Sequence, residues 1–380
     1  MLVSDLPTPA LLVDRARLHA NLDAMAARAD AQSVALRPHV KTHKSPAIAT
    51  MQVDRGARGL TVATVDEAEA FAETGFQDIR LASPVVGPTK LDRLAALAST
   101  GTRISFTVDS ARGVALASAA FSAAGASAEV LLEVDGGYGR CGVAYDDLPL
   151  AIDIAGRAAA ADGLRLVGVL SHGGDAYAAD GDDARRLAMD TERDRTLTAA
   201  QALVDAGLLD AATAEVSVGS TPGATVFTNA PEGGLRVTEI RPGTYALMDR
   251  MQVALGAASL LDCALVCVST VVSKKRFDDG TERVITDAGK KALTSDLAPG
   301  MDTFGEVLYS PRTMIAHPHA VVSALSEEHG WVDTPGGAIW DVADPVFVVP
   351  NHACVAVATR RQLYLVDGDE VVETLDVVAR

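Results

Sequence analysis

The stretch GLTVATVDEAEAFAETGFQDIRLASPVV, residues 59–86, contains two β-branched runs separated by an Ala-rich segment. The runs GLTVAT and DIRLASPVV are typical of buried strands, because they are short, apolar and bounded by turn residues. The segment between them has helical spacing, with Asp66 near its start and Gly75 as a plausible C-terminal stop. A strand, a helix and a second strand in this order predict a parallel βαβ unit.

The same alternation continues on both sides of this unit. Six further strand-like runs, separated by Ala-rich stretches, are SVALRPHVK, RISFTV, AEVLLEVD, LRLVGVLSH, AEVSVGS and RVTEIRPG. Eight strand–helix alternations within roughly 210 residues fit a closed parallel (β/α)₈ TIM barrel. An open doubly wound sheet is the alternative that this pattern leaves open.

After Pro242 the pattern changes to strands without long helices. The strand-like runs there include ALVCVSTVVSKK, ERVITDAG and VFVVPNHACVAVATRRQLYLVDGDEVVETLDVVAR, and the turns FDDGTE and VDGDE resemble hairpins. We therefore expect a barrel over residues 8–247 and an antiparallel β-rich domain over 248–380, which residues 1–7 can join. The opening run TPALLVD can belong to either unit.

Composition limits the classes of partner. The 380 residues carry a net charge of −17, which disfavours nucleic acid or an anionic membrane because either would be repelled. No run approaches 18 apolar residues, and MLVSDLPTP lacks the basic and apolar regions of a signal peptide. The four cysteines are scattered and form no CxxC pair, which favours a reduced, cytoplasmic compartment.

Titratable and small residues gather at the predicted ends of the barrel strands, where barrel enzymes place their active sites. The stretch LRPHVKTHKS, residues 36–45, ends strand one and includes Lys41. Strands seven and eight end in the loops Gly219–Ser220–Thr221 and Gly243–Thr244, whose hydroxyls and N–H groups suit a phosphate. A phosphate site opposite Lys41 suggests pyridoxal phosphate with a Schiff base on this lysine. On these motifs alone, ordinary turns and a solvated lysine remain the alternatives.

The stretch VDGGYGRCGV contains a GxGxxG pattern made by Gly137, Gly139 and Gly142. In a dinucleotide site this pattern should open a helix, but the continuation VAYDDLP is not a helix start. We therefore favour a glycine turn that lets Arg140 point into the barrel mouth, toward the phenolic oxygen of the cofactor.

Eight motifs occur in order along essentially the whole chain: RPHVKTHK, DGGYGRCG, SHGGDAY, VGSTPG, RPGTYALMDRMQ, DAGKKALTSD, LSEEHG and VPNHAC. Together they resemble the fold-type III pyridoxal phosphate enzymes that include the zinc-dependent D-serine dehydratases. D-threonine aldolases and enzymes acting on 3-hydroxyaspartate are close relatives of these dehydratases. HGGDAY and GSTPG resemble the dehydratase branch more than the aldolase branch. The resemblance implies a two-domain, alanine racemase-like subunit that forms a homodimer with its sites near the interface.

The resemblance also implies the cofactor-binding residues. It places the Schiff base on Lys41, the O3′ partner on Arg140 and an imidazole beside the cofactor ring on His172. Around the phosphate it places Tyr177, Ser220, Thr221, Gly243, Thr244 and Tyr245.

A metal site is implied at His352 and Cys354 of the HAC motif. Strand residues i and i+2 face the same side, so we expect this pair to present an imidazole and a thiolate to one ion. The soft thiolate favours Zn²⁺ over Mg²⁺ or Mn²⁺, and two protein ligands leave positions for substrate or water. Without the family context, a partly buried strand histidine and a small core cysteine would explain the same residues.

These residues together predict a carbon–oxygen lyase, an ammonia-lyase that acts on a D-β-hydroxy amino acid. Lys41 would remove the Cα proton and Zn²⁺ would assist departure of the β-hydroxide, giving a 2-keto acid and ammonia. D-serine, D-threonine and 3-hydroxy-D-aspartate all remain candidate substrates. No counterpart of the racemase tyrosine can be located in the β-rich half, which argues against racemisation. The alternatives are a metal-dependent D-threonine or 3-hydroxy-D-aspartate aldolase and a non-catalytic pyridoxal phosphate carrier, a class that lacks the β-rich half.

Overall fold

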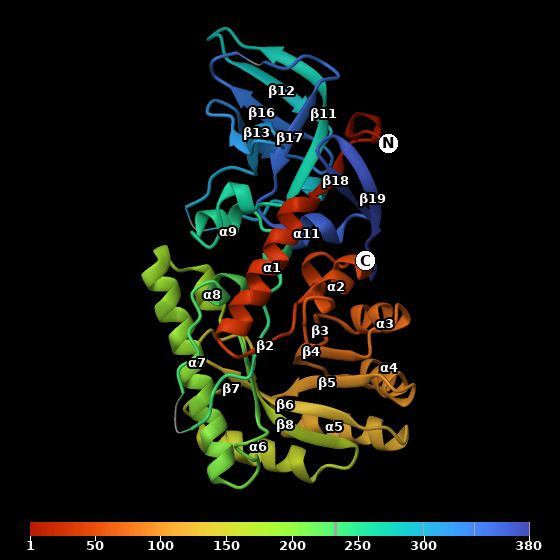
Figure 1. Ribbon diagram of the computed structural model, residues 1–380, viewed down its shortest axis with the longest axis vertical. Helices are drawn as coiled ribbons and strands as arrows, with labels where there is room; N and C mark the ends of the chain where they lie inside the picture. Colours follow the sequence, from red (N-terminus) through yellow and green to blue (C-terminus); the bar gives the residue numbers. More distant parts are fainter. Residues whose placement is uncertain (232–233, 299, 338, 380) are drawn as a thin grey trace.

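The computed structural model describes residues 1–231, 234–298, 300–337 and 339–379. Figure 1 shows two stacked parts, a barrel with helices around it and, above it, a second sheet. No helix within the described residues combines the length and the apolar character that crossing a bilayer requires.

Eight parallel strands form the barrel in the order β2-β10-β9-β8-β6-β5-β4-β3. A parallel bridge between His39 and Thr61 joins the two outer strands, and Thr61 N donates to Pro38 O at 2.8 Å. The expected (β/α)₈ architecture is therefore confirmed. The strands are β2 (Ala35–Leu36), β3 (Leu60–Val62), β4 (Asp78–Pro84), β5 (Arg103–Val108), β6 (Ala128–Asp135), β8 (Leu164–Ser171), β9 (Glu215–Val218) and β10 (Glu239–Ile240), with the short β7 (Val143–Ala144) beside β6.

Helices follow the barrel strands, and local sequence explains where they begin and end. Helix α3 (Val65–Glu73) starts slightly before the expected Asp66, because the Thr64 hydroxyl accepts from Glu67 N at 3.1 Å. Gly75 takes φ +103 after the last turn, the left-handed conformation that commonly ends helices. The other helices of this part are α1 (Arg15–Ala31), α2 (Pro46–Val53), α4 (Pro88–Ser99), α5 (Ala111–Ala123), α6 (Leu148–Ala160), α7 (Gly181–Asp205) and α8 (Thr221–Ala224).

The second sheet has the order β14-β13-β17-β11-β1-β18-β19, and β12, β15 and β16 extend it through β11. Its short helices are α9 (Arg250–Ala254), α10 (Lys290–Leu293) and α11 (Ala353–Ala358). The strands are β1 (Ala10–Asp14), β11 (Leu265–Arg276), β12 (Glu282–Thr286), β13 (Glu306–Ser310), β14 (Ile315–Ala316), β15 (Val321–Leu325), β16 (Gly330–Thr334), β17 (Pro345–Val349), β18 (Gln362–Asp367) and β19 (Glu370–Asp376).

Strand β1 corrects one expectation. It lies inside the range 8–247 that we assigned to the barrel, yet it runs antiparallel to β11 and parallel to β18 in the second sheet. The sequence left TPALLVD open between the two units, and strand pairing assigns it to the β-rich one. The division of the chain after residue 247 stays a prediction.

The barrel interior beneath the strand ends is filled by an ion network. Glu239 accepts from Arg37 Nε at 2.6 Å and from Arg80 Nη1 at 2.7 Å, and all three side chains are buried. Arg80 also pairs with Glu215 and donates from Nε to Ser105 at 2.9 Å. Because each buried charge has oppositely charged and hydrogen-bonded partners, the barrel holds these ions without leaving them unpaired.

Candidate active site

A cavity of about 260 Å³ lies at the C-terminal ends of the barrel strands, where α9 and the start of α11 approach them. Among the residues lining it are ten of the eleven predicted site residues: Lys41, Arg140, His172, Tyr177, Ser220, Thr221, Gly243, Thr244, His352 and Cys354. The structure therefore gathers residues from five barrel loops and from the β-rich half around one space. Their individual roles stay predictions.

Tyr245 is the predicted residue whose side chain lies elsewhere. Its backbone N–H donates to the Thr221 hydroxyl at 3.2 Å, but its own hydroxyl accepts from Gln52 Nε2 at 3.0 Å in the protein interior. Tyr245 therefore supports the predicted phosphate loop through its backbone.

Lys41 lies in a short 3₁₀ turn, Val40–Thr42, which residues 37–39 connect to β2. The next residue, Thr42, places its hydroxyl 3.2 Å from Cys354 Sγ. The loop carrying the predicted Schiff-base lysine thus contacts the segment carrying the predicted metal ligands.

Three further basic residues of the LRPHVKTHKS stretch, Arg37, His39 and His43, have different surroundings. Arg37 lies beneath the site in the ion network, and His43 is buried between Ser45 N, at 3.0 Å, and Gln52, at 3.2 Å. Burial lowers the pKa of His43 to about 4, so this imidazole is neutral. His39 lines the cavity, and its Nδ1 is buried without a partner among the described residues.

The loops after β9 and β10 form a cradle with a free hydroxyl. Thr221 Oγ1 joins the loops, because it accepts from Gly243 N at 3.1 Å as well as from Tyr245 N. Ser220 is 3% exposed and lines the cavity, and its hydroxyl has no hydrogen-bond partner within the described residues. A buried hydroxyl without a partner is costly, so this cradle fits the phosphate oxygen of pyridoxal phosphate.

Arg140 and His172 also line the cavity. Arg140 is exposed and lies near Glu133, with 3.9 Å between Nη2 and Oε1. Burial and the nearby Arg140 lower the pKa of His172 to about 3, so its ring is neutral. The charge of the Arg140 guanidinium favours an anionic cofactor and substrate.

Arg241 is a cavity residue that the sequence analysis missed. It is 4% exposed and donates from Nη1 to Ser217 Oγ at 2.6 Å, while that hydroxyl donates to Glu239 at 2.6 Å. This chain connects the cavity to the ion network in the barrel. The sequence did contain a signal for Arg241. Residues two apart face the same side of a strand, so Glu239 and Arg241, at the end of β10, could have been expected to lie on one face.

The HAC segment lines the cavity, but its backbone conformation differs from the expected strand. His352 is the N-cap of α11 and Cys354 lies in the first turn of that helix, so the expected strand is wrong. His352 has extended backbone angles, φ −139 and ψ 107, which lets both side chains face the cavity.

The His352 and Cys354 side chains influence each other's ionisation. Although burial opposes the charged form, the hydrogen bond and charge of Cys354 raise the pKa of His352 to about 9. Burial would raise the pKa of Cys354, but His352 and Lys41 lower it. An imidazole together with a soft thiolate fits Zn²⁺. Across the described residues, no group of three or more His, Cys, Asp or Glu side chains is arranged to hold a metal ion.

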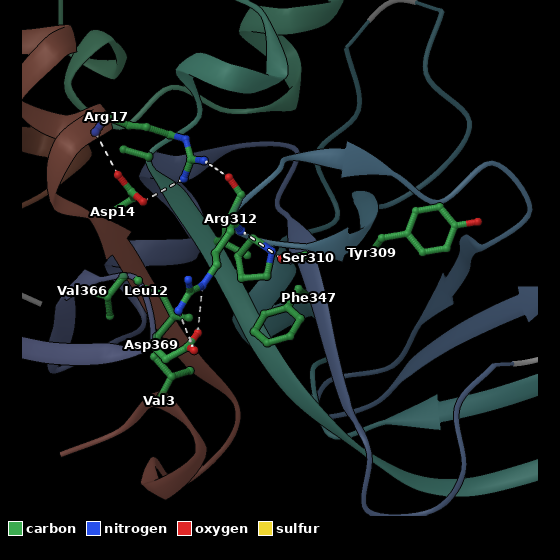
Figure 2. A pocket seen from close by; sticks show the side chains of 14 residues that line it. Val3, Leu12, Asp14, Arg17, Tyr309, Ser310, Arg312, Phe347, Val366 and Asp369 are labelled. Carbon is green, nitrogen blue, oxygen red and sulfur yellow. Dashed lines mark hydrogen bonds and ion pairs between the residues drawn. The ribbon is translucent and has the colours of Figure 1, made fainter.

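A second cavity, of about 160 Å³, lies in the β-rich half (Figure 2). Its charged side chains are already paired, since Arg17 Nη1 lies 2.9 Å from Asp14 and Arg312 Nη2 lies 2.6 Å from Asp369. None of the predicted site residues lines this cavity. The predicted site residues gather at the barrel mouth instead.

Comparisons with known proteins agree with this geometry. The model of the family "Alanine racemase, N-terminal domain" matches residues 13–251, and that of "Putative serine dehydratase domain" matches residues 264–366.

Relatives carry the similarity over nearly the whole chain. The D-threo-3-hydroxyaspartate dehydratase of Delftia sp. strain HT23 is 34% identical over 97% of this chain and 96% of its own length. A D-threonine aldolase of Arthrobacter sp. is 36% identical over 91% of this chain and 85% of its own. The solved structure of the Delftia dehydratase superposes with a TM-score of 0.90 at 33% identity, covering 99% of both chains.

Proposed function

This chain belongs to the alanine racemase-like family of fold-type III pyridoxal phosphate enzymes, and we propose that it is a zinc-dependent dehydratase of a D-β-hydroxy amino acid. One observation supports this most directly: Lys41, the free Ser220 hydroxyl and the His352–Cys354 pair line a single cavity. The product would be a 2-keto acid with release of ammonia. D-serine, D-threonine and 3-hydroxy-D-aspartate are the candidate substrates.

The residues that line the cavity would have different roles in the reaction. When bound, pyridoxal phosphate on the cradle supplies an electron sink at Cα, and Zn²⁺ on His352 and Cys354 supplies a Lewis acid at the β-hydroxyl. Lys41 takes the proton from Cα. The Thr42–Cys354 contact holds the lysine loop beside the metal ligands, so proton removal and hydroxide departure occur in one place.

The aldolase activity is the second candidate, because the Arthrobacter relative of 36% identity is a D-threonine aldolase. Both reactions use a lysine and a group that binds the β-hydroxyl. They differ in the bond that breaks, Cβ–O in the dehydratase and Cα–Cβ in the aldolase.

Borohydride reduction followed by peptide mapping tests the lysine. The purified protein should absorb near about 420 nm, and the reduced cofactor should mark Lys41. Lys44 is the internal control, since its ammonium is held by Ala379 O at 2.7 Å and Glu67 at 3.0 Å. Label on Lys44 or Lys290 would contradict the assignment.

A panel of D-β-hydroxy amino acids, assayed before and after chelation, tests the reaction. We expect a keto acid and ammonia, loss of activity on chelation with the yellow colour retained, and better recovery with Zn²⁺ than with Mg²⁺. Cys354→Ala should lower elimination by about 10²-fold or more. Glycine with an aldehyde or glyoxylate as the main products would favour the aldolase. Full activity after chelation would mean that His352 and Cys354 bind no catalytic metal.

We also propose an assembly and a cellular compartment for this protein. We expect a homodimer in which the β-rich half of one subunit covers the barrel mouth of the other. The four cysteines are free thiols, which supports a reducing, cytoplasmic location.

A further inference from the structure

One carboxylate outside the predicted site residues touches the proposed metal ligands. Asp296 Oδ2 lies 2.7 Å from His352 Nδ1. Asp296 belongs to the segment that follows α10, in the β-rich half. We propose that Asp296 is a positioning residue that fixes the tautomer and the orientation of His352, so that Nε2 of this imidazole is the atom offered to the metal. This inference rests on the zinc site of the proposed function.

The segment carrying Asp296 is built to meet His352. Thr294, which is 1% exposed, adopts φ +64 and ψ 159, a backbone region that residues other than glycine rarely enter. Its hydroxyl accepts from Asp296 N at 3.2 Å. Strained backbone of this kind persists where the surroundings hold it in place. Here it turns the chain so that Asp296 faces the HAC segment.

A second contact fixes the register between the two segments. Asn351, the residue before His352, donates from Nδ2 to the backbone carbonyl of Asp296 at 2.9 Å and to Thr303 O at 2.8 Å. Asp296 therefore meets neighbouring residues twice, through its carbonyl and through its carboxylate. Because the carbonyl contact does not depend on the side chain, substitution of Asp296 removes the His352 contact alone.

The chemistry of a histidine ligand explains the need for a carboxylate. A neutral imidazole can bind a metal through one nitrogen while the other keeps its proton as a donor. A carboxylate that accepts this proton holds the ring in place and makes the ligating nitrogen more basic, and losing such a partner typically weakens metal binding by about 10–100-fold. Asp296 stands at the nitrogen that would carry the proton.

Zinc titration of the cofactor-loaded, chelator-stripped protein against a chromophoric chelator tests the proposal. We expect Asp296→Ala to bind Zn²⁺ about 10–100-fold more weakly than wild type. Asp296→Asn retains an acceptor oxygen without the charge, so it should lose roughly threefold or more, but less than the alanine variant. Asp302→Ala, which changes an exposed carboxylate in the same region, is the matched control and should bind as wild type does.

Co²⁺ provides a readout that a general loss of stability would not imitate. The cysteine-to-cobalt charge-transfer absorption should appear in both Asp296 variants, but only at higher Co²⁺ concentrations than in wild type. Zn²⁺ affinity of Asp296→Ala within twofold of wild type would overturn the positioning role while leaving the metal site intact. If the alanine variant does not fold, the same twofold criterion applied to Asp296→Asn decides. Failure of the wild-type protein itself to bind Zn²⁺ would instead overturn the metal site and this inference with it.

Discussion

Glu192 is a buried carboxylate that connects two loops of the cavity from behind. Its Oε1 accepts from Gly219 N at 2.8 Å and from Ser171 Oγ at 3.0 Å. These two residues directly precede Ser220 and His172, which both line the cavity. Glu192 is not among the lining residues, and it fixes the position of these two loops relative to each other.

We expect Glu192→Ala to weaken binding of pyridoxal phosphate by about tenfold or more, because the buried Gly219 N–H would lose its acceptor. Glu192→Gln keeps an acceptor oxygen and should remain close to wild type. Titration of the apoprotein with cofactor, followed by absorbance, measures both. Equal affinity in the alanine variant would show that the loops hold their positions without this carboxylate.

Glu133 predicts a pH dependence of stability. It is 1% exposed, and burial raises its pKa from 4.5 to about 7, against the opposing influence of Arg241 and Arg140. Between these two pH values the folded protein keeps a proton that the unfolded chain has lost. The free energy of unfolding should therefore fall as pH rises from about 4.5 to about 7, by up to about 3 kcal/mol.

Glu133→Gln should lack this component, since its side chain does not titrate. Denaturant unfolding of both proteins at pH 5, 6, 7 and 8 measures the difference, and the variant should gain relative stability toward the higher values. Parallel pH profiles would mean that Glu133 is not the group responsible.

At the scale of elements, the HAC segment shows where a pattern in the sequence can mislead. The alternation in VPNHACVAVAT favours a strand, but β17 ends at Val349 and residues 353–358 form α11. The first helical N–H, on Ala353, is accepted by Asp249 Oδ2 at 2.8 Å. No local sequence pattern can reveal an acceptor that lies 104 residues away in the chain. The two predicted ligands could be identified by their chemical type, whereas their backbone could not.

The end of the chain supports the loop of the predicted catalytic lysine. Val378 N donates to Lys44 O at 2.8 Å, and Lys44 Nζ donates to Ala379 O at 2.7 Å. Lys44 itself adopts φ +48, a left-handed conformation that needs support in a residue other than glycine. The segment after β19 thus holds the backbone three residues from Lys41. Strand β19, which precedes this segment, contacts α2, the helix that follows the lysine loop (Figure 1).

Deletion of residues 378–380 should therefore loosen the lysine loop. Loss of two hydrogen bonds predicts a decrease of about 1–3 kcal/mol in the free energy of unfolding. Amide hydrogen exchange should rise selectively in the peptide covering residues 40–45. Deletion of residues 379–380 alone keeps the hydrogen bond from Val378 N to Lys44 O and should give the smaller effect. Unchanged exchange in this peptide would mean that the loop is held by the barrel alone.

At the scale of the whole molecule, the architecture could be predicted from the sequence, but the pairing between distant segments could not. The regular alternation of strands and helices predicted the barrel, because each βαβ unit forms from neighbouring segments. Strand β1 instead lies beside β18, with Leu12 opposite Tyr364, some 350 residues further along the chain. The polar barrel interior was also missed, since Arg80 and Glu215 find their partners only after the barrel closes.

The last prediction concerns assembly. The cavity lies where the barrel mouth faces the β-rich half, and Tyr309 and Ile315, on the paired strands β13 and β14, are exposed. Exposed apolar side chains at the end of a sheet suit an interface between subunits. Equilibrium sedimentation should give twice the 39.3 kDa of the chain. If the partner completes the site, specific activity should fall on dilution as dimers dissociate. The cofactor absorbance should change over the same concentration range. A monomer that keeps full activity would contradict this arrangement and would place the whole site within one chain.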